Sequence, residues 1–159
     1  MIIQKSYKFY AAHRNALLDD KCRNLHGHRY GVQVQFQVQR DGHLTTLFSN
    51  FDDKVEPHLL EQYDHAMLID RHDPLFPFLK MYEESTGDQL KLKILDFPTT
   101  VENIAFQLFT ELTDFGFDVF SINVKETDSS EFIYTRADWI DDSRRTAELK
   151  QAQAKLEKV

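Results

Sequence analysis

The sequence predicts an α+β fold: a four-stranded antiparallel sheet with two helices packed on one face. Apolar and polar residues alternate near both ends of the chain, with the two-residue period of half-buried strands. Two segments between these ends carry apolar residues at helical spacing. The expected order of strand, strand, helix, helix, strand, strand is typical of α+β folds. Since the 159 residues show no internal repeat, we expect a single domain over residues 1–140 and a helical tail over residues 141–159.

The first two strands are expected at residues 2–13 and 29–39. In the first strand, Tyr7, Phe9, Ala11 and His13 occupy alternate positions and therefore share one face. The second strand has one apolar and one polar face, as a strand buried on one side requires. Its apolar positions are Val32, Val34, Phe36 and Val38, and its polar positions are Gln33, Gln35, Gln37 and Gln39.

A first helix is expected at residues 49–63, where Asn50 or Asp52 can cap its N-terminus. Pro57 is tolerated in a first turn but not in a helix interior, so the regular part of this helix is expected to begin only near residue 56. A second helix follows residue 98. It opens with a capping box in which Thr99 is the N-cap and Glu102 reaches back to it.

Between the helices, residues 70–98 contain several proline and glycine turn signals, and we expect an irregular excursion over the surface. Two further strands are expected at residues 118–126 and 130–136. In the former, Phe120, Ile122 and Val124 share one apolar face, and Glu126 ends it. A narrow apolar stripe marks the tail, consisting of Leu149, Ala152, Leu156 and Val159.

Composition excludes several classes of function. The formal net charge of −7 argues against bulk nucleic-acid binding, which needs an excess of cations. No apolar run approaches the length of a membrane helix, and the N-terminus shows no secretory signal. The single cysteine, Cys22, cannot form an internal disulfide, which favours a free thiol in a reducing cytoplasm.

Three histidines point to a metal site. His26 and His28 lie two residues apart, just before the alternating run of the second strand, and in extended backbone both imidazoles face the same side, with only Gly27 between them. His13 ends the preceding strand, and pairing of the two strands would bring all three rings together. Three neutral nitrogens suit Zn²⁺ and leave a fourth coordination position open, as catalytic zinc sites require.

Cys22 lies four residues before His26, and three interpretations remain open. It could be a small buried residue, the fourth ligand of a closed structural zinc site, or a thiolate that acts as a general base beside the metal. Nearby cations lower the pKa of a thiol, and Arg14, Lys21 and Arg23 are the candidates, together with the zinc itself.

Two further acidic positions allow either a structural or a catalytic interpretation. Asp64-His65 could end a helix, where the dipole favours a histidine, or form a carboxylate-oriented imidazole that transfers protons near neutral pH. Glu126 could be a solvated strand end, or a carboxylate that accepts paired N–H donors from a planar, guanidine-like heterocycle.

Taken together and in order, these motifs resemble the 6-pyruvoyl-tetrahydropterin synthase family. The similarity runs from about residue 2 to residue 134, and the three-residue gap between Cys22 and His26 is similar to that of bacterial 6-carboxytetrahydropterin synthases of the queuosine (7-deazapurine) pathway. The segments that carry it are Phe9-Tyr10-Ala11-Ala12-His13-Arg14, Cys22-x-x-x-His26-Gly27-His28-x-Tyr30, Asp64-His65, Pro98-Thr99-Thr100-Val101-Glu102-Asn103 and Glu126-Thr127.

The resemblance implies a tunnelling fold, in which subunits join their sheets into a barrel with sites between subunits, as a tetramer or hexamer. It implies a zinc-dependent lyase that converts 7,8-dihydroneopterin triphosphate to 6-carboxy-5,6,7,8-tetrahydropterin, acetaldehyde and triphosphate. By motif position, His13, His26 and His28 would hold Zn²⁺ and Cys22 would be the base. Asp64 and His65 would relay protons, and Glu126 would anchor the pterin.

Two alternatives stay open at this point. The sister activity of the same family, 6-pyruvoyl-tetrahydropterin synthase, eliminates triphosphate without releasing acetaldehyde. A protein of another class, a non-catalytic zinc-stabilised assembly module, would use Cys22 to close the coordination sphere.

Overall fold

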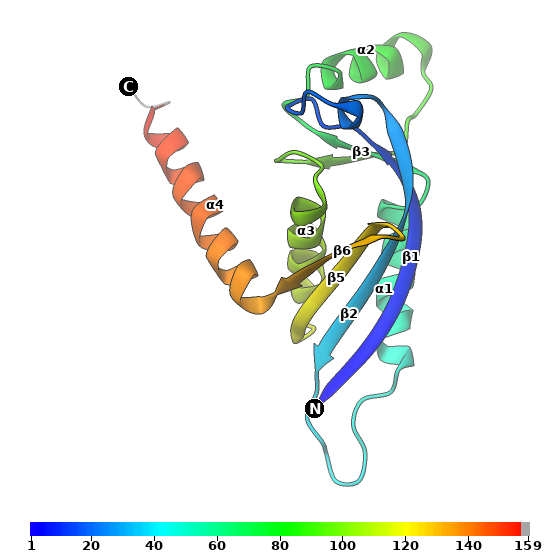
Figure 1. Ribbon diagram of the computed structural model, residues 1–159, viewed down its shortest axis with the longest axis vertical. Helices are drawn as coiled ribbons and strands as arrows, with labels where there is room; N and C mark the ends of the chain where they lie inside the picture. Colours follow the sequence, from blue (N-terminus) through cyan, green and yellow to red (C-terminus); the bar gives the residue numbers. More distant parts are fainter. Residues whose placement is uncertain (157–159) are drawn as a thin grey trace.

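The structure, a computed structural model, describes the backbone of residues 1–156 and the side chains of residues 1–151. The strands are β1 (Ile2–His13), β2 (His26–Gln37), β3 (Ala66–Asp70), β4 (Leu92–Leu95), β5 (Val119–Thr127) and β6 (Ser130–Thr135). The helices are α1 (Ser49–Gln62), α2 (Phe76–Thr86), α3 (Val101–Asp114) and α4 (Arg136–Leu156), and a short 3₁₀ turn spans Lys21–Arg23. Figure 1 shows the long strands β1 and β2 curving through the molecule.

The α+β class is confirmed, but the sheet has six strands in the order β4-β3-β1-β2-β5-β6 instead of the predicted four. It is also mixed, because β3 pairs parallel with both β1 and β4. The sequence did not reveal these two strands because each is short and lacks polar–apolar alternation. In β3, the consecutive residues Leu68 and Ile69 are both fully buried, as in parallel strands covered on two faces.

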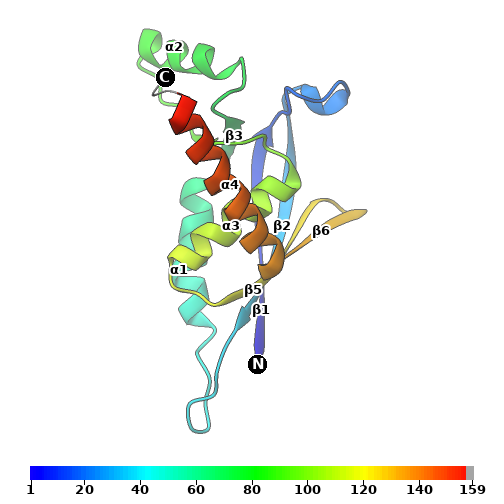
Figure 2. The ribbon, with the colours of Figure 1, turned by 90° about the vertical axis from the view of Figure 1, so that its left-hand side faces the viewer.

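Both α1 and α3 cover the same face of the sheet, as Figure 2 shows. The core lies between them and the alternate strand residues that face them, among which are Phe9, Tyr30 and Val34. The opposite face is polar: Gln35 hydrogen-bonds Gln4 across β1 and β2 at 2.9 Å. This one-sided covering is the arrangement that the alternation of β1 and β2 predicts.

Helix α1 begins at Ser49 and continues through Pro57, so the prediction that its regular part starts near residue 56 is wrong. Pro57 is exposed, so water can reach the carbonyl group that lacks its intrahelical partner. Neither predicted cap is used: the N-cap is Phe48, without a side-chain hydrogen bond. The helix lacks a side-chain cap and the hydrogen bond that Pro57 cannot donate. Burial of its apolar face compensates for both, through the side chains of Phe51, Val55 and Leu59.

Strand β5 contains an irregularity that also corrects a prediction. Its register against β2 shifts by one residue. Gln35 pairs with Ser121, but the next residue, Phe36, pairs with Val119, so Phe120 has no partner on β2. Phe120 is therefore 45% exposed instead of sharing the buried face of Ile122.

Residues 70–98, expected to be irregular, contain helix α2 and strand β4. Helix α2 has Pro77 in its first turn and ends at Gly87, whose φ of +74° is the left-handed conformation that glycine favours. Proline and glycine residues in and around these elements gave turn signals, so neither element was expected.

The C-terminal helix α4 starts at Arg136, earlier than the tail predicted over residues 141–159. Its first turns are anchored by Trp139, whose ring stacks on Phe109 at 5.3 Å, and the rest extends away from the sheet (Figure 1). Residues 157–159, including Val159 of the predicted stripe, lie outside the described residues. A single domain over residues 1–140 stays a prediction. Among the described helices, none has the length and apolar character needed to cross a bilayer.

A largely buried charged cluster centred on Glu111 joins α1, α3 and β4. The carboxylate of Glu111 accepts hydrogen bonds from His58 Nε2 at 2.7 Å, the Tyr63 hydroxyl at 2.7 Å and Lys93 Nζ at 2.5 Å. Gln107 adds a fourth bond at 2.7 Å. Burial raises the pKa of Glu111, but the contacts with His58, Lys93 and Tyr63 outweigh it and hold the pKa at about 2, against the usual 4.5.

This cluster predicts an acid-sensitive contribution to stability. The depressed pKa of Glu111 stabilises the fold above about pH 4.5, where Glu111 of the unfolded chain is ionised, and this stabilisation is lost as the pH falls through about 2. Urea unfolding should show that Glu111→Gln removes about 3 kcal/mol at pH 7 and progressively less below pH 4. Glu61→Gln, an exposed position on α1, is the matched control. An equal stability gap at pH 7 and pH 2 would contradict the assignment.

Candidate metal centre and active-site pocket

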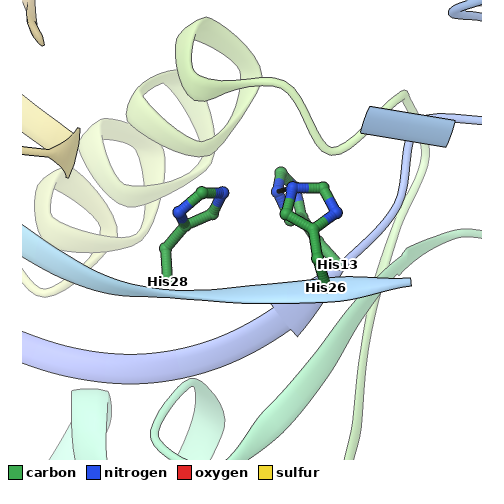
Figure 3. A group of neighbouring side chains, drawn as sticks. All are labelled: His13, His26 and His28. Atoms are coloured by element: carbon green, nitrogen blue, oxygen red, sulfur yellow. Dashed lines mark hydrogen bonds between the residues drawn. The ribbon is translucent and has the colours of Figure 1, made fainter. Parts of the chain in front are cut away.

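The three histidines lie together at one end of the β1–β2 ladder. His13 and His26 are direct partners in the antiparallel register, and His28 faces Ala11 two positions along. Their candidate ligand atoms all lie within 4.8 Å of one another (Figure 3). Gly27 allows this close pairing, because a Cβ atom there would lie 3.1 Å from the Ala11 carbonyl oxygen.

Hydrogen bonds to backbone carbonyls fix the tautomers of two of these rings. His13 Nδ1 lies 2.8 Å from the Thr99 carbonyl oxygen, and His26 Nδ1 lies 2.7 Å from the Asn24 carbonyl oxygen. A carbonyl can only accept, so each Nδ1 carries the proton and each Nε2 of a neutral ring presents a lone pair.

The two Nε2 atoms of His13 and His26 are 3.1 Å apart, the contact drawn as a dashed line in Figure 3. Two lone pairs at this distance repel unless an electron-pair acceptor lies between or beside them. A shared proton would make one ring a cation, and burial lowers the pKa of His13, which opposes that charge. The arrangement therefore fits a metal ion bound by neutral imidazoles.

Thr99 supports the site in a way that the sequence did not reveal. Its carbonyl accepts the His13 proton, and its hydroxyl donates to the Arg14 carbonyl at 2.9 Å. Thr99 is fully buried, and Thr100 is the N-cap of α3, without a side-chain hydrogen bond. The predicted capping box is therefore wrong, because Thr99 is bonded to the end of β1 instead of to α3.

A pocket of ≈ 750 Å³ opens onto the histidine cluster and is lined by Cys22, Glu126 and Glu102, among others. Glu126 reaches the cluster from the end of β5. Its Oε1 atom accepts a hydrogen bond from the Tyr30 hydroxyl at 3.2 Å and lies 3.8 Å from His13 Nε2. Tyr30 thus has a contact with the proposed pterin anchor that its place in the sequence motif did not indicate.

Cys22 lies in the 3₁₀ turn and lines the same pocket, but it is not part of the converging ligand group found in the described part of the chain. Desolvation and the Asp20 carboxylate raise the pKa of its thiol, and Lys21 only partly opposes them. Arg14 does not serve as a free cation here, since its Nε lies 3.3 Å from Asp73. Lys21 therefore acts in the expected direction, but its effect on the pKa is outweighed by desolvation and by Asp20.

Asp64 and His65 form the expected pair, with Oδ2 of Asp64 2.7 Å from Nδ1 of His65. The pair does not join the histidine cluster, however. It lies beside Tyr10, which occupies the other parity of β1 from His13 and therefore the opposite face of the sheet. There His65, whose side chain is 79% exposed, lines a second pocket of ≈ 670 Å³.

Comparison with known proteins places these features in a wider group. The profile of the 6-pyruvoyl tetrahydropterin synthase family matches residues 2–137. A protein of Haemophilus influenzae named 6-carboxy-5,6,7,8-tetrahydropterin synthase is 30% identical over 138 residues, which are 80% of this chain and 94% of that protein.

Two solved structures share the fold. The crystal structure of an uncharacterised protein from Wolinella succinogenes has a TM-score of 0.68 and 23% identity, covering 86% of this chain and 98% of the other. The 6-pyruvoyl tetrahydropterin synthase of Caenorhabditis elegans has a TM-score of 0.59 and 21% identity, covering 85% and 94% of the two chains. At these identities the likeness concerns the fold alone.

The histidine geometry predicts specific metal binding. His26→Ala should lower the affinity for Zn²⁺, used as the probe, by about 100-fold or more, since loss of even a supporting contact typically costs 10- to 100-fold. Isothermal titration with a competing chelator would measure the change. Cys22→Ala and His72→Ala should keep the affinity, because neither side chain belongs to the ligand group. If Cys22→Ala lost the metal together with the fold, Cys22 would be a structural ligand.

Proposed function

The chain belongs to the 6-pyruvoyl tetrahydropterin synthase family, and from this membership we propose that it is a zinc-dependent 6-carboxytetrahydropterin synthase. Its substrates would be 7,8-dihydroneopterin triphosphate and one water molecule, and its products 6-carboxy-5,6,7,8-tetrahydropterin, acetaldehyde and triphosphate. The observation that carries the proposal is the pocket in which His13, His26 and His28 converge beside Cys22 and Glu126.

Zn²⁺ is the metal that the donor set favours. Three neutral imidazoles, each presenting one nitrogen, suit Zn²⁺ and leave a position for substrate. Bound there, the ion supplies a Lewis acid that polarises a substrate oxygen and stabilises developing negative charge. The protein's own part is to keep His13 and His26 in the ligating tautomer through the carbonyl groups of Thr99 and Asn24.

Two side chains of the pocket have distinct roles in this proposal. The Cys22 sulfur takes a proton from a substrate carbon, as a general base must lie close to the reacting centre but outside the ligand set. The Glu126 carboxylate accepts the paired N–H groups of the pterin ring. Its bond from Tyr30 holds one oxygen in place while the other stays available.

The Asp64–His65 pair would serve as a proton relay on the other side of the substrate. The sheet separates this pair from the histidine cluster of its own chain, so we propose that it serves the pocket of a neighbouring copy. That arrangement requires a homo-oligomer, a tetramer or hexamer in which sheets join into a barrel and sites lie between subunits. A free Cys22 thiol and the queuosine pathway both suit a reducing cytoplasm.

The sister activity is the nearest alternative. The Caenorhabditis elegans protein of similar fold is named 6-pyruvoyl tetrahydropterin synthase, and a pocket of the same kind could eliminate triphosphate without cleaving a carbon–carbon bond. The name of the Haemophilus influenzae relative, and the three-residue gap between Cys22 and His26, favour the 6-carboxy product instead.

Analysis of the reaction products distinguishes these activities. Zinc-loaded protein incubated with 7,8-dihydroneopterin triphosphate should yield a 6-carboxy pterin and acetaldehyde, identified by mass spectrometry. A 6-pyruvoyl product without acetaldehyde would transfer the site to the sister activity. No turnover by folded, metal-loaded protein would leave the zinc-stabilised assembly module as the function to pursue. Protein stripped of metal by a chelator is the control and should be inactive.

A further inference from the structure

The turn that carries Asp64 and His65 holds an unfavourable backbone conformation. His65 has a φ of +56°, and among the described residues it is the non-glycine position with positive φ. Left-handed conformations are disfavoured for side chains with a Cβ atom and persist only where surrounding contacts hold them. The contacts around this turn therefore determine where the imidazole points.

Strand β1 provides one set of these contacts. The Tyr10 backbone N–H donates to Asp64 Oδ1 at 2.8 Å, and the His65 backbone N–H donates to the Tyr10 carbonyl at 2.6 Å. The other Asp64 oxygen is bonded to the His65 ring. The backbone of β1 and the Asp64 carboxylate together hold one side of the turn in place.

Lys91 provides the second set, from the residue just before β4. Its Nζ atom donates to the Asp64 carbonyl oxygen at 2.5 Å and to the Leu60 carbonyl oxygen at 2.7 Å. One ammonium group thus joins the last turn of α1 to the turn that follows it. Lys91 also lines the ≈ 670 Å³ pocket into which His65 faces, and it is exposed.

We propose that Lys91 is a positioning residue for the Asp64–His65 pair. By binding the carbonyls of Leu60 and Asp64, it keeps the turn in the left-handed conformation and the imidazole in the orientation that proton transfer needs. The inference rests on the catalytic role proposed for the pair. It also gives the segment 70–98 a function, since this segment supplies Lys91.

Two variants, one that removes the hydrogen bonds of Lys91 and one that keeps them, test this role. Lys91→Met keeps the length of the side chain and removes both hydrogen bonds, and it should lower kcat by about 10-fold or more with little change in KM, as small misplacements of catalytic groups do. Lys91→Arg should recover much of the loss, because a guanidinium can donate to both carbonyls. Amide hydrogen exchange at Tyr10 and His65 should accelerate in Lys91→Met.

Lys5→Met is the matched control, because Lys5 is a lysine of the same sheet that forms a 2.7 Å ion pair with Asp52. It should leave kcat and the two exchange rates unchanged. His65→Ala, measured in parallel, separates the two claims. If His65→Ala is slow and Lys91→Met keeps full kcat, or changes KM alone, the positioning role is overturned and the proposed function stands. If His65→Ala keeps full rate, the catalytic role of the pair and the role of Lys91 both fail.

Discussion

The register of the β1–β2 ladder is the constraint on which the candidate site depends. Pairing of His13 with His26 places three imidazoles from two strands on one face and at one end of the sheet. A slip of one residue would turn one strand's histidines to the opposite face. The same register holds Gly27 against Ala11, and the pairing of β2 with β5 brings the Tyr30 hydroxyl to Glu126, so β2 connects the metal ligands to the pocket wall.

The sheet also divides the candidate chemistry between its two faces. The histidine cluster, Cys22 and Glu126 lie toward α3, whereas His65 lies on the opposite face, beside Tyr10 and Leu79 of α2. A relay on the far side of the sheet cannot reach a substrate bound in its own chain's cluster. We therefore propose that assembly of several copies completes each site.

The parts that the sequence could predict are those with a regular period. Alternation along β1 and β2 predicted which residues face the core and that His13, His26 and His28 would converge. Strands β3 and β4 are too short to show an alternating pattern, and their parallel pairing depends on contacts between distant segments. The bulge that exposes Phe120 and the bonding of Thr99 to β1 are also tertiary effects that override a correct local pattern. The environment of Cys22 depends on Asp20 and on desolvation, which neighbouring positive residues in the sequence did not indicate.

We propose that one working site combines Cys22 from one chain with His65 from another. Co-expression of Cys22→Ala and His65→Ala chains, followed by isolation of mixed oligomers, tests it directly. Each variant alone should be nearly inactive, whereas mixed oligomers should regain a substantial fraction of wild-type turnover, because some sites then combine an intact Cys22 with an intact His65. Mixed oligomers of verified composition that stay as inactive as the parent variants would show that the two residues do not meet across chains.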